Sequence, residues 1–318
     1  MEVCFWGTRG SLPASFNAER VRDKVKFAVE TALEMGLLPG HDIDAFIDND
    51  LPFWASGTYG TNTPCVEIRD KDHMVLCDAG SGLRDFGNHF IGSHGPATPG
   101  DFHIFLSHLH WDHIHGFPFF TPAFIKGNRI TFHGCHDGME EAFSRQQSSP
   151  FFPISFKDLG ADIHFETLIP QRAYDIAGFR VTAIEQNHPG KSYGYRFERH
   201  GKVVVYSTDS EHKSEGDENS GSFVDFFSRA DLLIFDAQYT LAEASTVKED
   251  WGHSNNFIGV ELALKAGVRH LCLFHNEPVS GDRALYKLQG ETEKLAFILD
   301  RNARLQVSIS RDGMVIEV

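Results

Sequence analysis

The stretch His108-Leu109-His110-Trp111-Asp112-His113 places three imidazoles and one carboxylate within six residues, directly after the apolar segment 102–106. That segment is expected to form a strand. Residues two apart in an extended loop can point at one ion, so His108 and His110 are expected to share a metal. Asp112 and His113 follow where the chain turns and can serve a second ion. A His-rich surface loop is the alternative, because the chain has 18 histidines, but chance does not supply the strand and the interleaved carboxylate.

The pattern His-x-His-x-Asp-His resembles the signature of the metallo-β-lactamase superfamily, and four further motifs agree with it in order. They are Asp78 closing an early strand, His188 between two strand segments, Asp209 after an apolar run, and His275 at the end of a late strand. The resemblance extends over nearly all 318 residues. It implies an αββα sandwich, in which two mixed sheets pack together with helices outside, and a metal-dependent hydrolase.

The resemblance also implies a ligand set for two metals. His108, His110 and His188 hold one ion, Asp112, His113 and His275 hold the other, and Asp209 bridges them. Two divalent ions lower the pKa of a bridging water to roughly 7, and the resulting hydroxide is the expected nucleophile. Imidazole and carboxylate ligands without thiolate favour Zn²⁺, with Mn²⁺ or Fe²⁺ as alternatives.

Two later segments resemble a branch that contains RNase Z and the carbon–phosphorus-lyase accessory phosphodiesterase. Residues 232–238 are similar to the His-Glu-Ala-Thr segment of RNase Z, with Phe235 and Asp236 in place of its His and Glu. Gly252-His253-Ser254 is similar to its His-Ser-Thr loop. By this resemblance His253 is the general acid and Asp236 keeps it charged and oriented; Asp112 is counted with them as catalytic.

The small-residue segments Gly7–Ser11 and Tyr59–Thr63 also resemble elements of this branch and suit loops beside a phosphate. Arg9 is then either a ligand for a phosphoryl oxygen or a plain surface arginine. Between the two segments lies an insertion, 16–56, that the family normally replaces with a short turn. The insertion could cap the site or form a dimer surface, which leaves a homodimer open.

A phosphodiesterase acting on a small or cyclic phosphodiester is therefore the leading prediction. The alternatives are an RNase Z-like endoribonuclease, a glyoxalase-II-like thioesterase or lactonase, and a non-catalytic metal sensor. True β-lactamases lack an Asp at the position of Asp209, which argues against that activity. RNase Z grips tRNA with a flexible, Gly- and basic-rich arm, whereas the segment 193–208 here is expected to be a plain hairpin. A formal charge of −15 also disfavours folded tRNA as a partner.

Composition bounds the architecture and the location. With 41% hydrophobic residues and 28 Phe, residues 1–318 are expected to form one domain around a large core. The five cysteines are scattered and suggest neither a disulfide framework nor a structural zinc site. Because the chain shows no leader-like or membrane-spanning segment, the protein is expected to be cytoplasmic and not to bind a membrane.

The hydrophobic pattern predicts the secondary structure. Strands are expected at 2–7, 63–70, 73–78, 102–107, 129–134, 163–169, 179–186, 193–198, 202–208, 231–236, 270–275, 305–310 and 314–318. Helices are expected to fill the gaps, including 18–35, 256–266 and 282–300. Asn17 is the candidate cap of the first, and either Asn255 or Ser254 that of the second. Asp312-Gly313 is a turn signal that predicts a closing hairpin at the end of the chain.

Overall fold

The computed structural model describes residues 1–212, 220–239, 252–301 and 305–318. Its strands are β1 (Glu2–Gly7), β2 (Cys65–Asp70), β3 (His73–Cys77), β4 (Asp101–Phe105), β5 (Arg129–Gly134), β6 (Asp162–Thr167), β7 (Ala173–Ile176), β8 (Phe179–Gln186), β9 (Ser192–Arg199), β10 (Lys202–Ser207), β11 (Leu232–Asp236), β12 (His270–Phe274), β13 (Gln306–Ile309) and β14 (Val315–Glu317). The predicted strands are present, with ends shifted by a few residues.

The helices lie between these strands. They are α1 (Ala18–Glu34), α2 (Ile43–Ala45), α3 (Phe53–Ser56), α4 (Gly82–His94), α5 (Trp111–Ile114), α6 (Met139–Gln146), α7 (Ser220–Phe227), α9 (Asn256–Ala266) and α10 (Asp282–Leu299). Among the described residues there are also a π-helical turn (Phe46–Asp50) and three 3₁₀ turns (Phe117–Phe119, Thr121–Phe124, Phe156–Asp158). The cap of α1 is as predicted, since the Asn17 side chain accepts a hydrogen bond from the Arg20 amide. Of the two candidates for α9, Asn255 is the cap, and its side chain accepts a hydrogen bond from the Ile258 amide.

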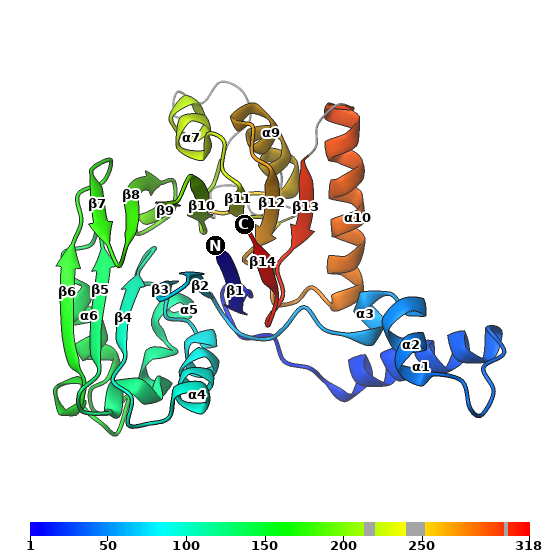
Figure 1. The fold of residues 1–318 in the computed structure, drawn as a ribbon, viewed down its shortest axis with the longest axis horizontal. Coiled ribbons are helices and arrows are strands. Elements are labelled where there is room, and N and C mark those ends of the chain that lie inside the picture. The colour runs from blue at the N-terminus through cyan, green and yellow to red at the C-terminus, as the bar shows by residue number, and fades with distance from the viewer. Residues whose placement is uncertain (213–219, 240–251, 302–304) are drawn as a thin grey trace.

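The strands form two seven-stranded sheets (Figure 1), in the orders β14-β1-β2-β3-β4-β5-β6 and β13-β12-β11-β10-β9-β8-β7. Strands β3 to β6 run parallel in the first sheet, and β10 to β13 run parallel in the second. Strand β8 has the same direction as β10, because both are antiparallel to β9. Parallel strands place their carboxyl ends at one edge of a sheet, where sites are usually built.

Three apolar cores make this a four-layer αββα sandwich. The central core joins the inner faces of both sheets, for example Phe105 from β4 against Tyr195 and Phe197 from β9. A second core joins the second sheet to α7, α9 and α10, and a third joins the first sheet to α4, α6 and the 3₁₀ turns. Each fully buried aromatic contributes about 1.5–3 kcal/mol. Of the Phe-rich segments 117–120 and 223–227, Phe117, Phe120, Phe223 and Phe227 lie in these cores, whereas Phe119 is exposed.

The structure corrects two expectations about the elements. The predicted closing hairpin is wrong: β13 pairs with β12 in the second sheet, whereas β14 pairs with β1 in the first. The turn at Asp312-Gly313 is real, but it carries the chain from one sheet to the other. Strand β7 was not expected from the sequence. It is the edge strand of the second sheet, paired with β8, and its residues alternate between exposed and half-buried. No helix among the described residues has the length and apolar character needed to cross a membrane.

Candidate metal centre

The predicted ligands follow the carboxyl ends of strands from both sheets. His108 and His110 lie in the loop after β4, and Asp112 and His113 lie in the short helix α5 that continues it. His188 follows β8, Asp209 follows β10, and His275 follows β12. The sandwich therefore brings together side chains from four separate parts of the sequence.

These seven residues form two adjoining groups. The ligand atoms of His108, His110 and His188 lie within 4.8 Å of one another, and so do those of Asp112, His113, Asp209 and His275. In the first group, His188 Nε2 lies 3.2 Å from His110 Nδ1. In the second, the Nε2 atoms of His113 and His275 each lie 3.2 Å from Asp112 Oδ2.

Asp209 lies between the two groups and turns one oxygen toward each. Its Oδ1 is 3.2 Å from the Nε2 atoms of both His113 and His275. Its Oδ2 is 3.6 Å from His108 Nε2 and 3.8 Å from His188 Nε2. One carboxylate is therefore shared by both sets of imidazoles.

The donor set fits divalent cations. Nε2 of His108 is buried, faces the cluster and has no hydrogen-bond partner. A buried ring nitrogen without a partner is costly, and a cation removes that cost. Burial lowers the pKa of His108, which keeps it a neutral ligand. Burial opposes ionisation of Asp209, but His113 and its neighbours hold the pKa of Asp209 well below its usual range. Burial opposes protonation of His113, but Asp209, Asp112 and Asp78 raise its pKa. These pKa directions therefore give a neutral imidazole at His108 and an ionised carboxylate at Asp209.

Asp78 anchors the cluster from behind. Its carboxylate accepts hydrogen bonds from His113 Nδ1 (2.7 Å), Ser107 Oγ (2.8 Å), the Ser107 amide (2.7 Å) and the Tyr206 hydroxyl (2.7 Å). These bonds fix the ring of His113 with Nε2 toward the centre. A carboxylate behind a ligating histidine also raises the basicity of that ring.

The chain matches the beta-lactamase superfamily domain model over residues 73–276, an interval that contains all seven predicted ligands. That interval is more than half of the chain. The chain belongs to this family.

Named relatives and solved structures agree with this assignment. The chain is 29% identical to a ribonuclease Z from Staphylococcus carnosus over 175 residues, which are 50% of this chain and 53% of that protein. It is 23% identical to a ribonuclease Z from Picrophilus torridus over 258 residues, which are 68% of this chain and 80% of that protein. The first match thus spans about half the length of the relative.

Three solved structures share the fold over the full length of this chain. They are YhfI, a metallo-beta-lactamase fold protein from Bacillus subtilis (TM-score 0.64, 19% identity, 99% of that chain), the short form of human tRNase Z (0.59, 19%, 99%) and a diphosphatase of the PhnP family (0.58, 17%, 97%). These likenesses support the αββα sandwich.

In this beta-lactamase superfamily domain, His253 lies beside the cluster and is paired with Asp236. His253 Nδ1 is 2.8 Å from Asp236 Oδ2, and the His253 ring stacks on that of His275 with centroids 5.0 Å apart. One ring nitrogen of His253 also lies within 4.8 Å of ligand atoms of His188 and Asp209. Burial opposes protonation, but Asp236 raises the pKa of His253 to about 9. The pairing expected from the sequence is therefore present.

Several residues that position the ligands were not found from the sequence. The Gly252 carbonyl lies 2.8 Å from His188 Nδ1, and Gln238 Oε1 lies 3.0 Å from His275 Nδ1. Each acceptor holds the proton on Nδ1 and leaves Nε2 free for the centre. The sequence contained a signal for Gly252, because this residue opens the Gly-His-Ser motif. It contained none for Gln238.

The segment Gly7–Ser11 contacts two of the predicted ligands. Within it, Arg9 fits neither interpretation of the sequence, a phosphate ligand or a surface arginine. The Ser11 amide donates to Asp112 Oδ2 at 2.8 Å, and a Cβ on Gly10 would lie 2.5 Å from His275 Nδ1. Arg9 is buried, donating to the carbonyls of Gly60 and Ser280 and lying 3.6 Å from Asp282. It is neither a surface arginine nor exposed to a substrate, and it ties the start of the chain to the start of α10.

Proposed function

We propose that this protein is a metal-dependent hydrolase of small or cyclic phosphodiesters. Membership of the beta-lactamase superfamily and the buried His/Asp cluster indicate a metal-dependent hydrolase. The observation that supports a phosphodiester is the His253–Asp236 pair beside the cluster. A protonated imidazole is needed where the leaving group is a poor one, such as a sugar hydroxyl.

The proposed centre holds two divalent ions. His108, His110 and His188 would bind one, and Asp112, His113 and His275 the other, with Asp209 shared between them. Zn²⁺ is favoured by ligands that are all imidazole or carboxylate, with Mn²⁺ or Fe²⁺ as alternatives. Such ions neutralise phosphoryl oxygens and lower the pKa of water.

The residues of the chain supply the remaining steps. Asp236 is fixed by the amides of Ser210 (3.0 Å) and Gln238 (3.2 Å), so its carboxylate accepts the Nδ1 proton of His253 in one orientation. Nε2 of His253 is left to deliver a proton to the leaving oxygen as its bond to phosphorus breaks. Water supplies the oxygen of the new bond to phosphorus, and its proton restores His253.

An RNase Z-like endoribonuclease is the second candidate, because the curated relatives that match are named ribonuclease Z. Thioesters and lactones are less suited to the site. A thiolate leaves without a proton, so a thioesterase would have no use for His253. A panel of phosphodiesters, thioesters and lactones, assayed with protein of known metal content, separates these classes; turnover of thioesters or lactones alone would refute the proposal.

His253→Ala tests the role of the acid. The variant should keep its metals and lose phosphodiesterase turnover by about 10²–10⁴-fold on substrates with poor leaving groups. The loss should be much smaller for nitrophenyl diesters, because nitrophenolate departs without a proton. Asp236→Asn, which removes the charge behind the ring, should show part of the same pattern. Equal losses across a leaving-group series would show that His253 is not the acid.

A further inference from the structure

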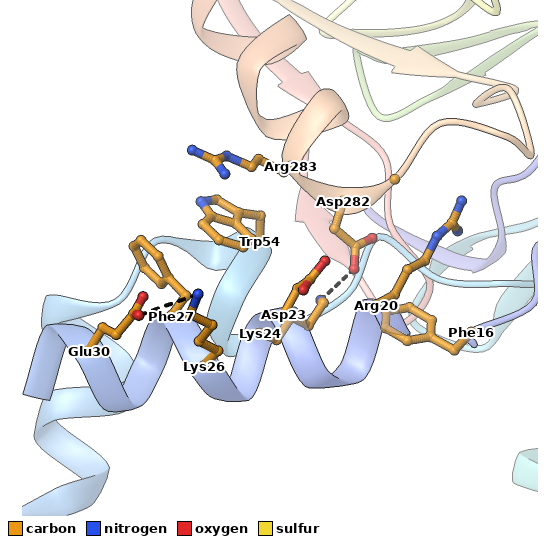
Figure 2. Close-up of a pocket in the computed structure, with 11 residues that line it drawn as sticks. Phe16, Arg20, Asp23, Lys24, Lys26, Phe27, Glu30, Trp54, Asp282 and Arg283 are labelled. Atoms are coloured by element: carbon orange, nitrogen blue, oxygen red, sulfur yellow. Dashed lines mark hydrogen bonds and ion pairs between the residues drawn. The ribbon is translucent and has the colours of Figure 1, made fainter. Parts of the chain in front are cut away.

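Helix α1, in the insertion, is attached to the protein along one side only. Figure 2 shows that side: Phe27 lies against Trp54 of α3 with ring centroids 4.6 Å apart, and Lys24 pairs with the buried Asp282 at the start of α10. A hollow of about 400 Å³ remains between α1 and α10. No residue of α1 is buried, and the helix extends beyond the two sheets (Figure 1).

The opposite side of α1 carries an apolar ridge. Val21, Val25, Val29 and Leu33 recur every four residues and are 47%, 58%, 53% and 73% exposed. Met35, Leu38, Ile43 and Ile47 are exposed just beyond it. Of the 21 exposed large apolar side chains in the described part of the chain, eight therefore fall within residues 18–47. Such a concentration is typical of an interaction surface.

A second ridge beside the apolar one carries charges of opposite sign at its two ends. It consists of Arg22, Lys26, Glu30 and Glu34, again at intervals of four. Lys26 lies 3.6 Å from Glu30 of its own helix, and both also line the hollow toward α10, so pairing with a second copy would exchange this contact for one between chains. In an antiparallel pair of identical helices, each ridge meets its own copy in reverse order. Arg22 would then face Glu34 of the other copy, and Lys26 would face Glu30. Both ridges have their midpoints near residues 27 and 28, so one two-fold axis serves them together.

We propose that α1 is a self-association surface, on which a second copy of this chain packs its own α1 antiparallel. The charge order favours a second copy, because it is complementary to itself. A helix of 17 residues is about 25 Å long, and one helix pair buries less than the roughly 800 Å² per partner of a standard interface. The apolar side chains at 35–47 must therefore contribute, and we expect dissociation constants on the order of micromolar.

The first test is sedimentation velocity of the full chain over a range of concentrations. The wild type should pass from monomer to dimer, and Val25→Lys/Val29→Lys should remain monomeric. Ile154→Lys/Ile169→Lys is the matched control, because it places two lysines at exposed apolar positions far from α1 in sequence. The control should dimerise as the wild type does. A wild type that stays monomeric, or a dimer that survives Val25→Lys/Val29→Lys, would overturn the proposal.

Charge reversal tests the antiparallel arrangement. Arg22→Glu/Lys26→Glu and Glu30→Lys/Glu34→Lys should each weaken self-association by about tenfold or more. Mixing the two variants should restore a dimer, since one then carries an acidic ridge and the other a basic one. The fourfold reversal should self-associate like the wild type. If the mixture fails to associate, the surface does not pair with itself. The same conclusion follows if Arg22→Glu/Lys26→Glu leaves self-association unchanged and lowers only the affinity of the protein for RNA, measured by titration with an RNA oligonucleotide.

Discussion

Asp78, Asp209 and His275 each adopt a left-handed backbone conformation, with φ of 63°, 45° and 60°. Residues other than glycine avoid this region, at a cost of order 1–3 kcal/mol each. Asp78 and His275 follow directly on strands β3 and β12, Asp209 lies two residues beyond the end of β10, and all three point into the cluster or support it. The left-handed turn directs each side chain away from the strand and toward the site. The backbone strain therefore costs stability locally and positions the ligands and their support.

Asp209→Asn tests the shared carboxylate. The amide offers an oxygen to one group of imidazoles but only an NH₂ to the other. Elemental analysis of reconstituted protein should therefore show two ions per wild-type chain and at most one in the variant, with turnover reduced at least about a hundredfold. Asp175→Asn, at an exposed aspartate of β7, should retain both ions. Equal metal content in wild type and Asp209→Asn would contradict the bridging role.

Gly252→Ala tests the contact that orients His188. A Cβ at this position would lie 2.4 Å from His188 Nδ1, on a backbone with φ of +84°. Gly201 has a similar φ of +75° but open space around its Cβ position, so Gly201→Ala carries the same backbone cost without the contact. Both variants should lose roughly 1–2 kcal/mol of stability. Gly252→Ala alone should lose metal and activity, and matching activities would show that the contact is unimportant.

At the level of elements, most of the fold could be predicted because apolar runs and caps are local signals. The loop at 108–113 and strands such as β10 and β12 were found for this reason. The closing hairpin failed because the turn at Asp312-Gly313 does not determine which sheet the next strand joins. That choice depends on β1, which offers β14 an edge more than 300 residues away in sequence. Gln238 was missed for a similar reason, since only the folded chain brings it to His275.

Strand β12 carries a buried histidine outside the cluster that should make stability depend on pH. Burial lowers the pKa of His270 to about 4 from the ordinary 6.5, and its Nε2 lies 2.7 Å from Ser308 Oγ. The unfolded chain therefore binds the proton more readily. This histidine supports the fold fully above pH 6.5, and its contribution is lost as the pH falls toward 4.

His270→Gln should remove that dependence while keeping a polar group near Ser308. The stability difference between wild type and variant should be constant above pH 7 and change by about 2–3 kcal/mol in favour of the variant by pH 4. Urea unfolding of both proteins after metal removal measures it. Parallel stability curves over the whole range would contradict a buried, neutral His270.

For the whole molecule, the family assignment and the sandwich agree with the sequence, and the single-domain organisation stays a prediction. The two sheets share the central core, and the predicted ligands come from both. Although the net charge is −15, one short segment is rich in basic residues. Arg20, Arg22, Lys24 and Lys26 lie together at the start of α1. Lys24 pairs with Asp282 and Lys26 with Glu30, so much of this cluster is neutralised.

Whether the substrate is a small phosphodiester or tRNA depends on the charge distribution of the whole molecule. Polyanion affinity comes chiefly from phosphate contacts by Lys and Arg and falls steeply as salt rises. Strands β9 and β10 form a hairpin joined by His200-Gly201, in the segment where the sequence predicts a plain hairpin and not the arm of RNase Z. We therefore expect higher catalytic efficiency on cyclic nucleotides and nitrophenyl diesters than on precursor tRNA at near-physiological salt. Activity on the small diesters should change little between about 50 and 200 mM salt, while any activity on tRNA should fall by orders of magnitude. Efficient trimming of the tRNA 3′ end that persists at 200 mM salt would favour the endoribonuclease instead.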